Sequence, residues 1–430
     1  MDKTLPTGKL SRGKVVGKAL LKIGANKSKR FLTNGDKTQS HEAVADIIFD
    51  TLAELKGVSV KIAQQVALGM PFLSPAYLEK ISKSFNAIPS INKALVRKII
   101  KAELGDYPQA VFDRFSMEAF AAASLGQVHL AARGDETLAV KVQYPGIKKS
   151  IESDMNLIHF GLKRFAKGQN VDHIVTEIEK RLYEEVDYVL EANNAAFFKE
   201  NLDNENVVIP QVYPELSSRK VLTTSFLEGL DFDAYLATNP TQEEKNGYAQ
   251  LIFDNYFISL YQLKRIHADP NPGNFLFLGD GKLGLIDFGC VKKIDRDFLQ
   301  SYTALHLDLL AGVEDEILVQ HYYRLGMIEK DTPQKMLQFY QEVIKPLDRL
   351  YIEPLSGDGY DFKVHNDFSR RGFEIIFEVQ KKQYHSVHQM NEDYLFLDRT
   401  LLGYYALFEK MGARIETQNM KNLMQEIQND

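Results

Sequence analysis

The sequence predicts an α+β protein with two lobes and a helical N-terminal extension. Over residues 41–68 the apolar side chains recur every three or four positions, which is the spacing of an amphipathic helix. Residues 110–145 instead hold short apolar runs bounded by glycine and charged turns, a pattern typical of β-hairpins. Beyond Gly229 helical spacing returns. This order predicts a helical leader, then a small strand-rich lobe, then a large helix-rich lobe.

Shorter segments complete this outline. A second helix is predicted near residues 93–104, and helical spacing with many charges resumes over 150–200. Four apolar runs are predicted as strands: residues 207–209, 221–226, 275–277 and 283–286. We expect three regions: the basic leader and helical extension (1–105), the N-terminal lobe with an alanine-rich loop and inserted helices (106–228), and the helical C-terminal lobe (229–430).

The composition is that of an ordinary globular protein. Of the 430 residues, 44% are hydrophobic and 26% are charged. The single cysteine, Cys290, excludes an internal disulfide framework, so a reducing compartment such as the cytoplasm is expected. No run approaches the roughly 20 apolar residues of a membrane span, and no secretory signal is visible. The most apolar regions, 251–263 and 394–408, contain charged residues and are predicted to be buried helices.

Charge is distributed unevenly along the chain. The first thirty residues carry nine basic side chains against Asp2 alone, which gives +8 there and −14 for the remainder of a chain whose net charge is −6. A basic end on an acidic body suggests an anionic partner, such as a membrane surface that the protein contacts peripherally. An equally good interpretation is a solvated basic arm. No nucleic-acid partner is expected.

Residues 267–274 read His-Ala-Asp-Pro-Asn-Pro-Gly-Asn, with Asn274 five positions after Asp269. This is the spacing of a kinase catalytic loop, in which the aspartate takes a hydroxyl proton or orients a water molecule. The amide oxygen of the asparagine binds a metal ion there. The prolines and Gly273 require an irregular loop. The alternative interpretation is an ordinary proline- and glycine-rich turn with polar side chains.

A second acidic motif follows the apolar run 283–286. Asp287 is succeeded by Phe288 and Gly289, thirteen residues after Asn274. A carboxylate at the end of a strand, followed by glycine, suits a Mg²⁺ ligand at the mouth of a cleft. The three-residue motif alone is weak evidence, but its spacing from Asn274 makes the prediction much stronger.

A lysine precedes both motifs, in the strand-like segment Leu-Ala-Val-Lys-Val that ends at Val142. Lys141 matches the strand lysine that pairs with the α- and β-phosphates of ATP in kinases. Its natural partner is a helix glutamate, for which we favour Glu185 and keep Glu191 as the rival. Two alternatives remain, namely that Lys141 is an edge charge and that the glutamates belong to a solvated helix face.

The segment that should cradle the phosphates is rich in alanine instead of glycine. It reads Ala121, Ala122, Ala123, Ser124, Leu125 and Gly126, one hairpin before Lys141. Alanine lacks the freedom of glycine at positive φ, so we expect a stiff loop that is even partly helical. The Ser124 hydroxyl would donate a hydrogen bond towards phosphate. The alternative interpretation is a simple packing segment.

Together these motifs resemble the UbiB/ADCK family of atypical kinases, and within it the members that support coenzyme Q biosynthesis. The resemblance extends over most of residues 5–410. Its matching segments, besides the alanine-rich loop and residues 267–274, are Leu5-Pro6-Thr7 with Leu10-Ser-Arg12, Leu55-Lys56-Gly57 with Lys61-Ile-Ala-Gln64, Val140-Lys141-Val-Gln-Tyr-Pro145-Gly146, Glu185-Val-Asp187-Tyr with Glu191-Ala-Asn193, Leu285-Ile-Asp-Phe-Gly289 and Leu395-Phe-Leu-Asp-Arg399.

The resemblance implies a protein-kinase-like fold with the helical extension laid across the cleft. Lys61 and Gln64 match a family motif that occupies the space a protein substrate would need, and so would gate the cleft. Ala63 replaces the glycine of that motif. Asn271 stands where the family usually has histidine, so a hydrogen-bonding amide replaces a side chain near the γ-phosphate.

The resemblance also implies what the protein binds and where it acts. We expect ATP or ADP with Mg²⁺, slow ATP hydrolysis, and a role in isoprenoid quinone biosynthesis or lipid homeostasis at a membrane. Adenine would bind backbone groups near Glu228. Expected partners are a membrane surface, a lipid or quinone precursor, and proteins of quinone biosynthesis, in the cytoplasm or in an organelle. Two alternatives stay open: a small-molecule phosphotransferase and a nucleotide-gated, lipid-binding scaffold.

Overall fold

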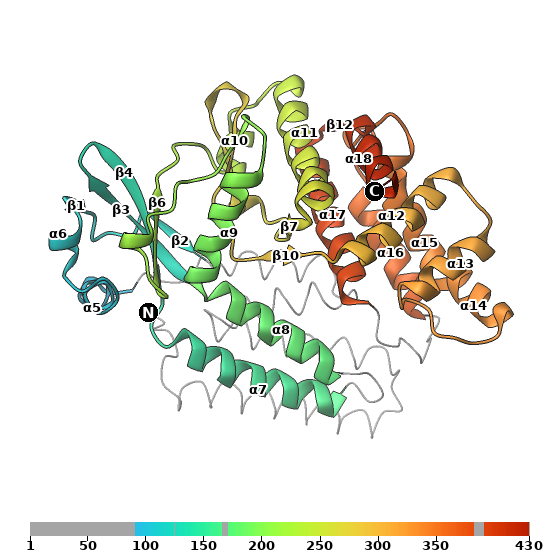
Figure 1. Cartoon of the computed structure of the whole chain (residues 1–430), viewed down its shortest axis with the longest axis horizontal. Helices are drawn as coiled ribbons and strands as arrows, with labels where there is room; N and C mark the ends of the chain where they lie inside the picture. The colour runs from blue at the N-terminus through green and yellow to red at the C-terminus, as the bar shows by residue number, and fades with distance from the viewer. Residues whose placement is uncertain (1–90, 124, 166–170, 382–390, 430) are drawn as a thin grey trace, which may run out of the picture. The chain divides into compact units, whose positions relative to one another are not determined.

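A computed structural model describes residues 91–123, 125–165, 171–381 and 391–429 (Figure 1). The predicted leader helix over 41–68 lies outside the described residues. The chain divides into two compact units. The first comprises Met1–Val189 with Tyr213–Thr223, and the second comprises Leu190–Val212 with Thr224–Asp430.

The first unit is built on a five-stranded sheet. Its strands are β1 (Arg114–Phe115), β2 (Ala121–Ala123), β3 (Gly126–Arg133), β4 (Glu136–Gln143) and β6 (Val221–Ser225). The order is β1-β3-β4-β6, and β2 pairs with β3. The long β3–β4 hairpin confirms the strand pattern predicted over 110–145, and Gly134 turns it at a φ of 58°. The mixture of helices and sheets in the described residues confirms the predicted α+β fold, to which this unit contributes the largest sheet.

Helix α5 (Lys93–Leu104) packs on this sheet, where the sequence predicts a helix. Asn92 caps its first turn by accepting hydrogen bonds from two backbone N–H groups, and Gly105 ends it at a φ of 90°. The core beneath it joins Val96 and Ile100 to apolar residues of the sheet. A short helix, α6 (Pro108–Val111), leads from α5 into β1.

Three helices follow the hairpin and confirm the helical pattern over 150–200. They are α7 (Ile147–Phe165), α8 (Val171–Glu185) and α9 (Tyr188–Asn201), and α7 and α8 lie side by side (Figure 1). The Asp187 side chain accepts a hydrogen bond from the Val189 N–H and so starts α9. The Gln143 amide donates to the Val186 carbonyl at 2.8 Å, which fixes the α8–α9 corner against the end of β4.

The described residues of the second unit form three small sheets. Strands β5 (Val207–Val208), β9 (Leu283–Leu285) and β8 (Phe275–Phe277) form one, in that order. These three lie where the sequence predicts strands. Strand β7 (Arg265–His267) pairs with β10 (Val291–Lys293), and β11 (Gly359–Asp361) pairs with β12 (Arg414–Glu416). The sequence predicts none of the last four. The two strands of each of these pairs lie more than 20 residues apart, so no local hairpin pattern marks them.

Helices make up most of the second unit. They are α10 (Phe232–Ala237), α11 (Gln242–Ile258), α12 (Arg296–Ala311), α13 (Asp315–Arg324), α14 (Pro333–Phe339), α15 (Lys345–Ser356), α16 (Phe368–Lys381), α17 (Glu392–Met411) and α18 (Gln418–Asn429). Thr241 and Glu244 form a capping box at the start of α11. The apolar region 394–408 lies within α17, and the apolar region 251–263 is formed by the end of α11 and a π-helical turn over Ser259–Leu263. Most of the apolar side chains in both regions are buried, as predicted. Among the described residues, no helix is both long and apolar enough to cross a membrane.

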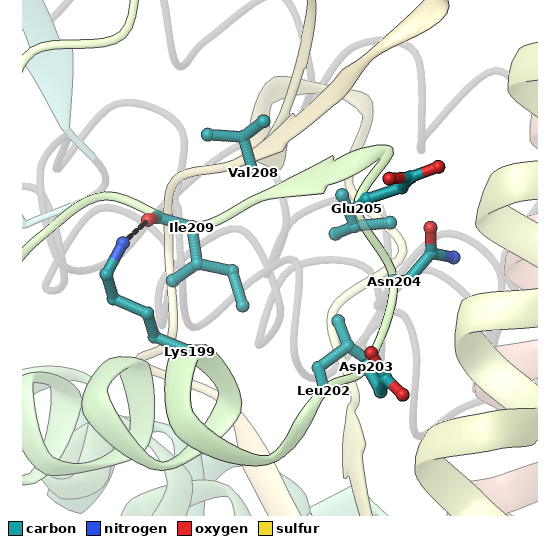
Figure 2. A pocket seen from close by; sticks show the side chains of 8 residues that line it. Lys199, Leu202, Asp203, Asn204, Glu205, Val208 and Ile209 are labelled. Atoms are coloured by element: carbon teal, nitrogen blue, oxygen red, sulfur yellow. Dashed lines mark hydrogen bonds between the residues drawn. The ribbon is translucent and has the colours of Figure 1, made fainter.

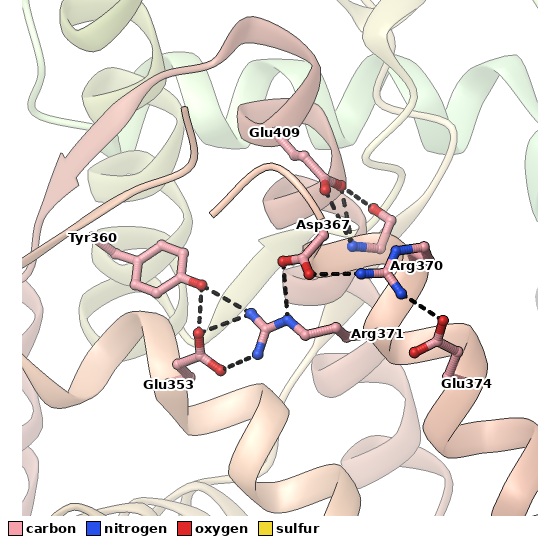
Figure 3. A network of polar contacts seen from close by, with 8 residues as sticks. Glu353, Tyr360, Asp367, Arg370, Arg371, Glu374 and Glu409 are labelled. Carbon is pink, nitrogen blue, oxygen red and sulfur yellow. Dashed lines mark hydrogen bonds and ion pairs between the residues drawn. The ribbon is translucent and has the colours of Figure 1, made fainter. Parts of the chain in front are cut away.

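An ion network ties α16 to its neighbours (Figure 3). The Arg371 guanidinium donates to both oxygens of Glu353 in α15, at 2.7 and 2.8 Å. The Tyr360 hydroxyl of β11 donates to the same carboxylate at 2.5 Å. The Arg371 hydrogen bonds hold the pKa of Glu353 below its usual range. Because bidentate pairs fix geometry as well as charge, this network sets the position of α16 on α15.

A second polar cluster lies deep in the helical core. Asp348 is 6% exposed, and the Tyr322 hydroxyl donates to its Oδ1 at 2.5 Å. The Tyr322 hydroxyl also lies 3.1 Å from that of Tyr394. Nearby, the Tyr302 hydroxyl donates to Asp398 at 3.0 Å. Burial raises the pKa of Asp398 well above its usual range, so this carboxyl group favours the protonated form.

Asp348 should make the stability of this helical core depend on pH. Burial raises its pKa to about 7, while Tyr322 and Lys345 lower it and Asp315 raises it. An aspartate in the unfolded chain has a pKa of about 4. The contribution of protonated Asp348 to the unfolding free energy is therefore complete below about pH 4 and is lost as pH rises towards 7. Between those limits the unfolding free energy should fall by about 1.4 kcal/mol per pH unit relative to Asp348→Asn. Urea unfolding of both proteins at pH 5, 6, 7 and 8 measures this, and a constant difference would contradict it.

Candidate functional site

The predicted catalytic loop leaves strand β7 at His267, which is 3% exposed. The His267 Nε2–H donates to the backbone carbonyl of Asp287 at 2.6 Å. The Ala268 N–H donates to the Cys290 carbonyl at 2.9 Å. These two hydrogen bonds join the predicted catalytic loop to both ends of the Asp287-Phe288-Gly289 segment. The two motifs therefore form one hydrogen-bonded structure.

Within the loop, the backbone is held by its own polar side chains. The Asn271 N–H donates to Asp269 Oδ1 at 3.2 Å, and the Gly273 N–H donates to Asn271 Oδ1 at 3.0 Å. Both contacts are Asx turns, in which a short side chain replaces a backbone acceptor. Asn271 thus has a structural task that histidine would perform less well. The hydrogen bond predicted for this amide was placed near the γ-phosphate, whereas in the structure its oxygen accepts from the loop backbone.

Asn274 and Asp287 lie at the same end of the β8–β9 hairpin. Phe275 pairs with Leu285 in the register of that hairpin, and the Ile286 N–H donates to the Asn274 carbonyl at 3.1 Å. The Asn274 side-chain NH₂ group donates to the Asp269 carbonyl at 3.1 Å. The side-chain oxygen of Asn274 is then the atom that could bind a metal ion. The structure therefore brings together the three residues predicted for acceptor and metal chemistry in the second unit.

Asp287 is held by the residues that follow it. The Gly289 N–H donates to Asp287 Oδ1 at 2.9 Å. The Phe288 ring is 2% exposed and meets the His267 ring edge-on, with 5.7 Å between centroids. The Asn194 amide in α9 donates to the Phe288 carbonyl at 3.0 Å. Backbone and ring contacts thus fix the segment on both sides of the carboxylate.

The oxygen atoms of Asp287 and Asn274 fit Mg²⁺ as a ligand set. No group of three or more histidine, cysteine, aspartate or glutamate side chains within the described part of the chain is arranged to hold a metal ion. Mg²⁺ commonly takes only one or two protein carboxylates and completes its octahedron with phosphate oxygens and water. One carboxylate, Asp287, and one amide oxygen, Asn274, match that pattern. They do not match a zinc or calcium site, which needs more protein ligands.

In the first unit the alanine-rich segment is not helical, contrary to our expectation. Ala121–Ala123 is strand β2, and it pairs with β3 from Ala121 opposite Val128 to Ala123 opposite Gly126. Helix propensity is a weak preference that pairing to an adjacent strand overrides. Ala121 and Ala122 are exposed, while Leu125 is buried in the turn. Ser124 lies outside the described residues, so its predicted hydroxyl contact stays a prediction.

Lys141 lies on β4 opposite Val128, one hairpin from the alanine-rich strand as predicted. Its Nζ is 5.1 Å from the centre of the Tyr188 ring. Tyr188 is 1% exposed, and its hydroxyl reaches the backbone at Gly126. Tyr188 therefore contacts both the lysine and the end of the predicted phosphate cradle. Tyr188 ends the matching segment Glu185-Val-Asp187-Tyr, but no role was predicted for it from the sequence.

The partner of Lys141 stays a prediction. Glu185 is the last residue of α8 and is half-buried. Glu191, its rival, lies in the first turn of α9 and is 2% exposed. A glutamate is rarely this deeply buried unless it is paired.

Glu228 follows strand β6, in the segment predicted to bind adenine. The backbone N–H and carbonyl of Leu230 exchange hydrogen bonds with Phe277 at 3.0 and 2.8 Å, which fixes the end of this segment. A Cβ atom at Gly229 would lie 2.6 Å from the Leu278 side chain. The segment is thus closely packed on the β8 side, but its binding of a nucleotide remains a prediction.

Gly126 is expected to tolerate no side chain. A Cβ atom there would lie 2.6 Å from the Tyr188 hydroxyl and 2.6 Å from the Val142 carbonyl oxygen. Because the second of these is a backbone atom inside the sheet, Gly126→Ala should lower the unfolding free energy by about 1–3 kcal/mol. Gly247→Ala is the matched control, since a Cβ atom at this helical glycine meets nothing within 4 Å. Urea unfolding of both variants checks this, and equal stabilities would contradict it.

A cavity of about 340 Å³ opens between the end of α9 and strand β5 (Figure 2). Its lining includes Lys199, Asp203 and Glu205, and the Lys199 ammonium donates to the Ile209 carbonyl at 2.8 Å. It contains none of the residues predicted for nucleotide or metal binding. Lys61 and Gln64, the predicted gating residues, lie outside the described residues, as does Ala63 between them.

The fold and these paired motifs define a protein-kinase-like protein. Residues 83–321 match the model of the ABC1 atypical kinase-like domain, and the chain belongs to that family. The resemblance to UbiB/ADCK atypical kinases is thereby confirmed.

Relatives support the same assignment. The chain is 27% identical to the mitochondrial atypical kinase COQ8 of Saccharomyces cerevisiae over 96% of its own length and 84% of that protein. It is 26% identical to the probable serine/threonine-protein kinase abkA of Dictyostelium discoideum, over 96% of its length and 78% of that protein. A Mycobacterium tuberculosis structure, described as a complex of Rv3197 with erythromycin, shares the fold with a TM-score of 0.63 and 24% identity. That alignment covers 91% of this chain and 97% of the other.

Proposed function

We propose that this protein binds Mg²⁺ with ATP or ADP and hydrolyses ATP slowly, in support of isoprenoid quinone biosynthesis or lipid homeostasis at a membrane. The observation that carries the proposal is the joining of Asp269, Asn274 and Asp287 into one hydrogen-bonded structure at the end of the β8–β9 hairpin. Phosphoryl transfer needs few covalent steps from the protein and depends on positioned charges. A loop fixed at both ends provides that positioning.

Each residue then has a defined task. Asn274 and Asp287 would hold Mg²⁺, which neutralises charge on the phosphates when bound. Asp269 accepts the proton of the attacking hydroxyl or orients the attacking water. Lys141 binds the α- and β-phosphates, and Glu185 orients Lys141. Ala121, Ala122, Ala123 and Ser124 line the phosphates, and Glu228 marks the backbone that binds adenine.

Two features support slow hydrolysis and argue against protein substrates. Asn271 is neutral, so this position supplies no cation to the γ-phosphate, and its side-chain oxygen already accepts from the Gly273 N–H. Stabilisation of the negative charge that develops on the phosphates in the transition state would then depend more heavily on the metal ion and Lys141. Lys61 and Gln64 would occupy the space that a protein substrate needs.

The membrane part of the proposal depends on the basic first thirty residues, whose charge is +8. Each basic side chain near an anionic bilayer contributes about 1 kcal/mol of attraction. The proposed partners are a membrane surface, a lipid or quinone precursor, and proteins of quinone biosynthesis. The yeast relative is named as mitochondrial, and we propose a membrane-bounded organelle or the cytoplasm as the site of action.

ATP turnover in the presence of vesicles tests the proposal. Phosphate release would be measured without liposomes, with neutral liposomes, and with anionic liposomes that carry a polyprenylated phenol. We expect Mg²⁺-dependent turnover that is higher with the anionic liposomes carrying a polyprenylated phenol than under the other two conditions. Turnover equal in all three would contradict the membrane part, and transfer of labelled phosphate to an added metabolite would favour the small-molecule phosphotransferase.

A further inference from the structure

Helix α17 begins about 70 residues beyond the segment that matches the family model, yet its middle contacts the catalytic loop. A Cβ atom at Gly403 would lie 2.3 Å from Cγ and 2.8 Å from Cβ of Pro270. A proline ring is rigid and cannot turn aside as a flexible side chain would. The helix backbone therefore lies directly against the residue that follows Asp269, and only glycine permits this approach.

The next residue of the helix makes a polar contact to the same loop. The Tyr404 hydroxyl donates to the His267 carbonyl at 3.0 Å, and the side chain is 3% exposed. Its ring packs edge-on against Phe275, the first residue of β8, with 6.2 Å between centroids. Tyr404 thus touches the residue that begins the loop and the residue that follows Asn274.

The start of α17 reaches the other side of the site. Asp393 forms an ion pair with Lys292 at 2.5 Å, and the two side chains are 27% and 15% exposed. Lys292 lies in β10, three residues after Gly289, and pairs with Ile266 of β7. One helix therefore contacts the entry to the catalytic loop, the residue after Asp269, and the strand that follows Asp287.

We propose that α17 is a positioning element that sets Asp269, Asn274 and Asp287 in register for the Mg²⁺–nucleotide complex, with Gly403 and Tyr404 as its positioning residues. This inference rests on the proposed function. Alanine is a better helix former than glycine by about 1 kcal/mol, so helix stability alone would favour alanine at position 403. The glycine is explained by the approach to Pro270. A displacement of the catalytic groups on the order of 1 Å can lower the rate about a hundredfold. The close contact between Gly403 and Pro270 should therefore affect ATP turnover.

The chain offers a matched control for each test variant. Tyr404→Phe removes one hydroxyl and keeps the ring, and Tyr405→Phe is its control. The Tyr405 hydroxyl makes no hydrogen bond within the part of the chain that the structure describes. Gly403→Ala adds one methyl group against Pro270, and Gly247→Ala adds one that meets nothing within 4 Å.

The first measurement is amide hydrogen exchange in the full-length protein, without metal or nucleotide. Tyr404→Phe and Gly403→Ala should speed exchange at Ala268 and Asn274, whose N–H groups hold the loop closed. Exchange in the β11–β12 pair should stay at the wild-type rate. Acceleration spread evenly over both regions, or none in the loop, would overturn the inference.

The second measurement is the kinetics with ATP, together with Mn²⁺ binding in the presence of ADP. We expect Tyr404→Phe to lower kcat about three- to tenfold, the effect of losing one buried hydrogen bond, with KM for ATP within about twofold. Gly403→Ala should lose about a hundredfold in kcat. Wild-type protein that neither binds Mn²⁺ nor hydrolyses ATP would refute the proposed function as well. Wild-type protein that does both, with test variants equal to their controls, would refute the inference alone.

Discussion

Asp287→Asn is expected to reduce Mg²⁺-dependent ATP turnover by about a hundredfold or more. The substitution removes the only charged metal ligand that we assign, and the loss of one positioned electrostatic group costs about 100- to 1,000-fold in other enzymes. The fold should survive, because an asparagine oxygen can still accept the Gly289 N–H. Phosphate release as a function of Mg²⁺ concentration measures the effect.

Asp280→Asn provides the control for this substitution. Asp280 lies in the exposed turn between β8 and β9 at a φ of 58°, a conformation that asparagine adopts readily. The same change of charge, seven residues away, should leave turnover within about twofold of wild type. Equal losses in the two variants would show that net charge, and not the metal site, explains the effect.

Asp287→Asn also distinguishes an ATPase from a nucleotide-gated scaffold. If hydrolysis is the function, cells that lack the protein should not be rescued by Asp287→Asn. Full rescue by a variant with no measurable turnover would contradict the ATPase proposal and favour a nucleotide-gated scaffold.

Lys141→Met is expected to weaken ADP binding about ten- to hundredfold. A charge-assisted hydrogen bond to phosphate contributes about 1.5–3 kcal/mol, and methionine keeps the length of the apolar stem without the charge. The Tyr188 ring, 5.1 Å from the ammonium, should still pack against the new side chain. Titration with a fluorescent ADP analogue measures the affinity.

Lys293→Met is the matched control, because Lys293 is an exposed lysine on a short strand. Its affinity for the analogue should equal that of wild type. An unchanged affinity in Lys141→Met would contradict the role of this lysine in phosphate binding.

Much of the fold could be predicted because its signals are local. Helix α5 has both an asparagine cap and a terminal glycine, and the structure begins and ends it between them. Strands β8 and β9 are apolar runs separated by glycines, and both lie where the sequence predicts them. The spacing of Asp269, Asn274 and Asp287 predicted a shared site because the residues at the two ends of a β-hairpin lie close together in space.

What the sequence could not show depends on contacts between distant residues. The alanine-rich segment was expected to be partly helical, but its partner strand makes it β2. The task of Tyr188 depends on Gly126 and Lys141, which lie in another part of the chain. Gly403 and Tyr404 reach Pro270 and His267 across more than 130 residues, and no local pattern marks that contact.

Calorimetric titration of the full-length protein with ADP, in Mg²⁺ and in EDTA, tests the central claim most directly. The claim is that Asn274 and Asp287 hold a metal ion that the nucleotide shares. We predict saturable binding of one nucleotide per chain in Mg²⁺, with affinity at least about tenfold lower in EDTA and in Asp287→Asn. Binding of equal strength in Mg²⁺ and EDTA, or no binding in either, would contradict it.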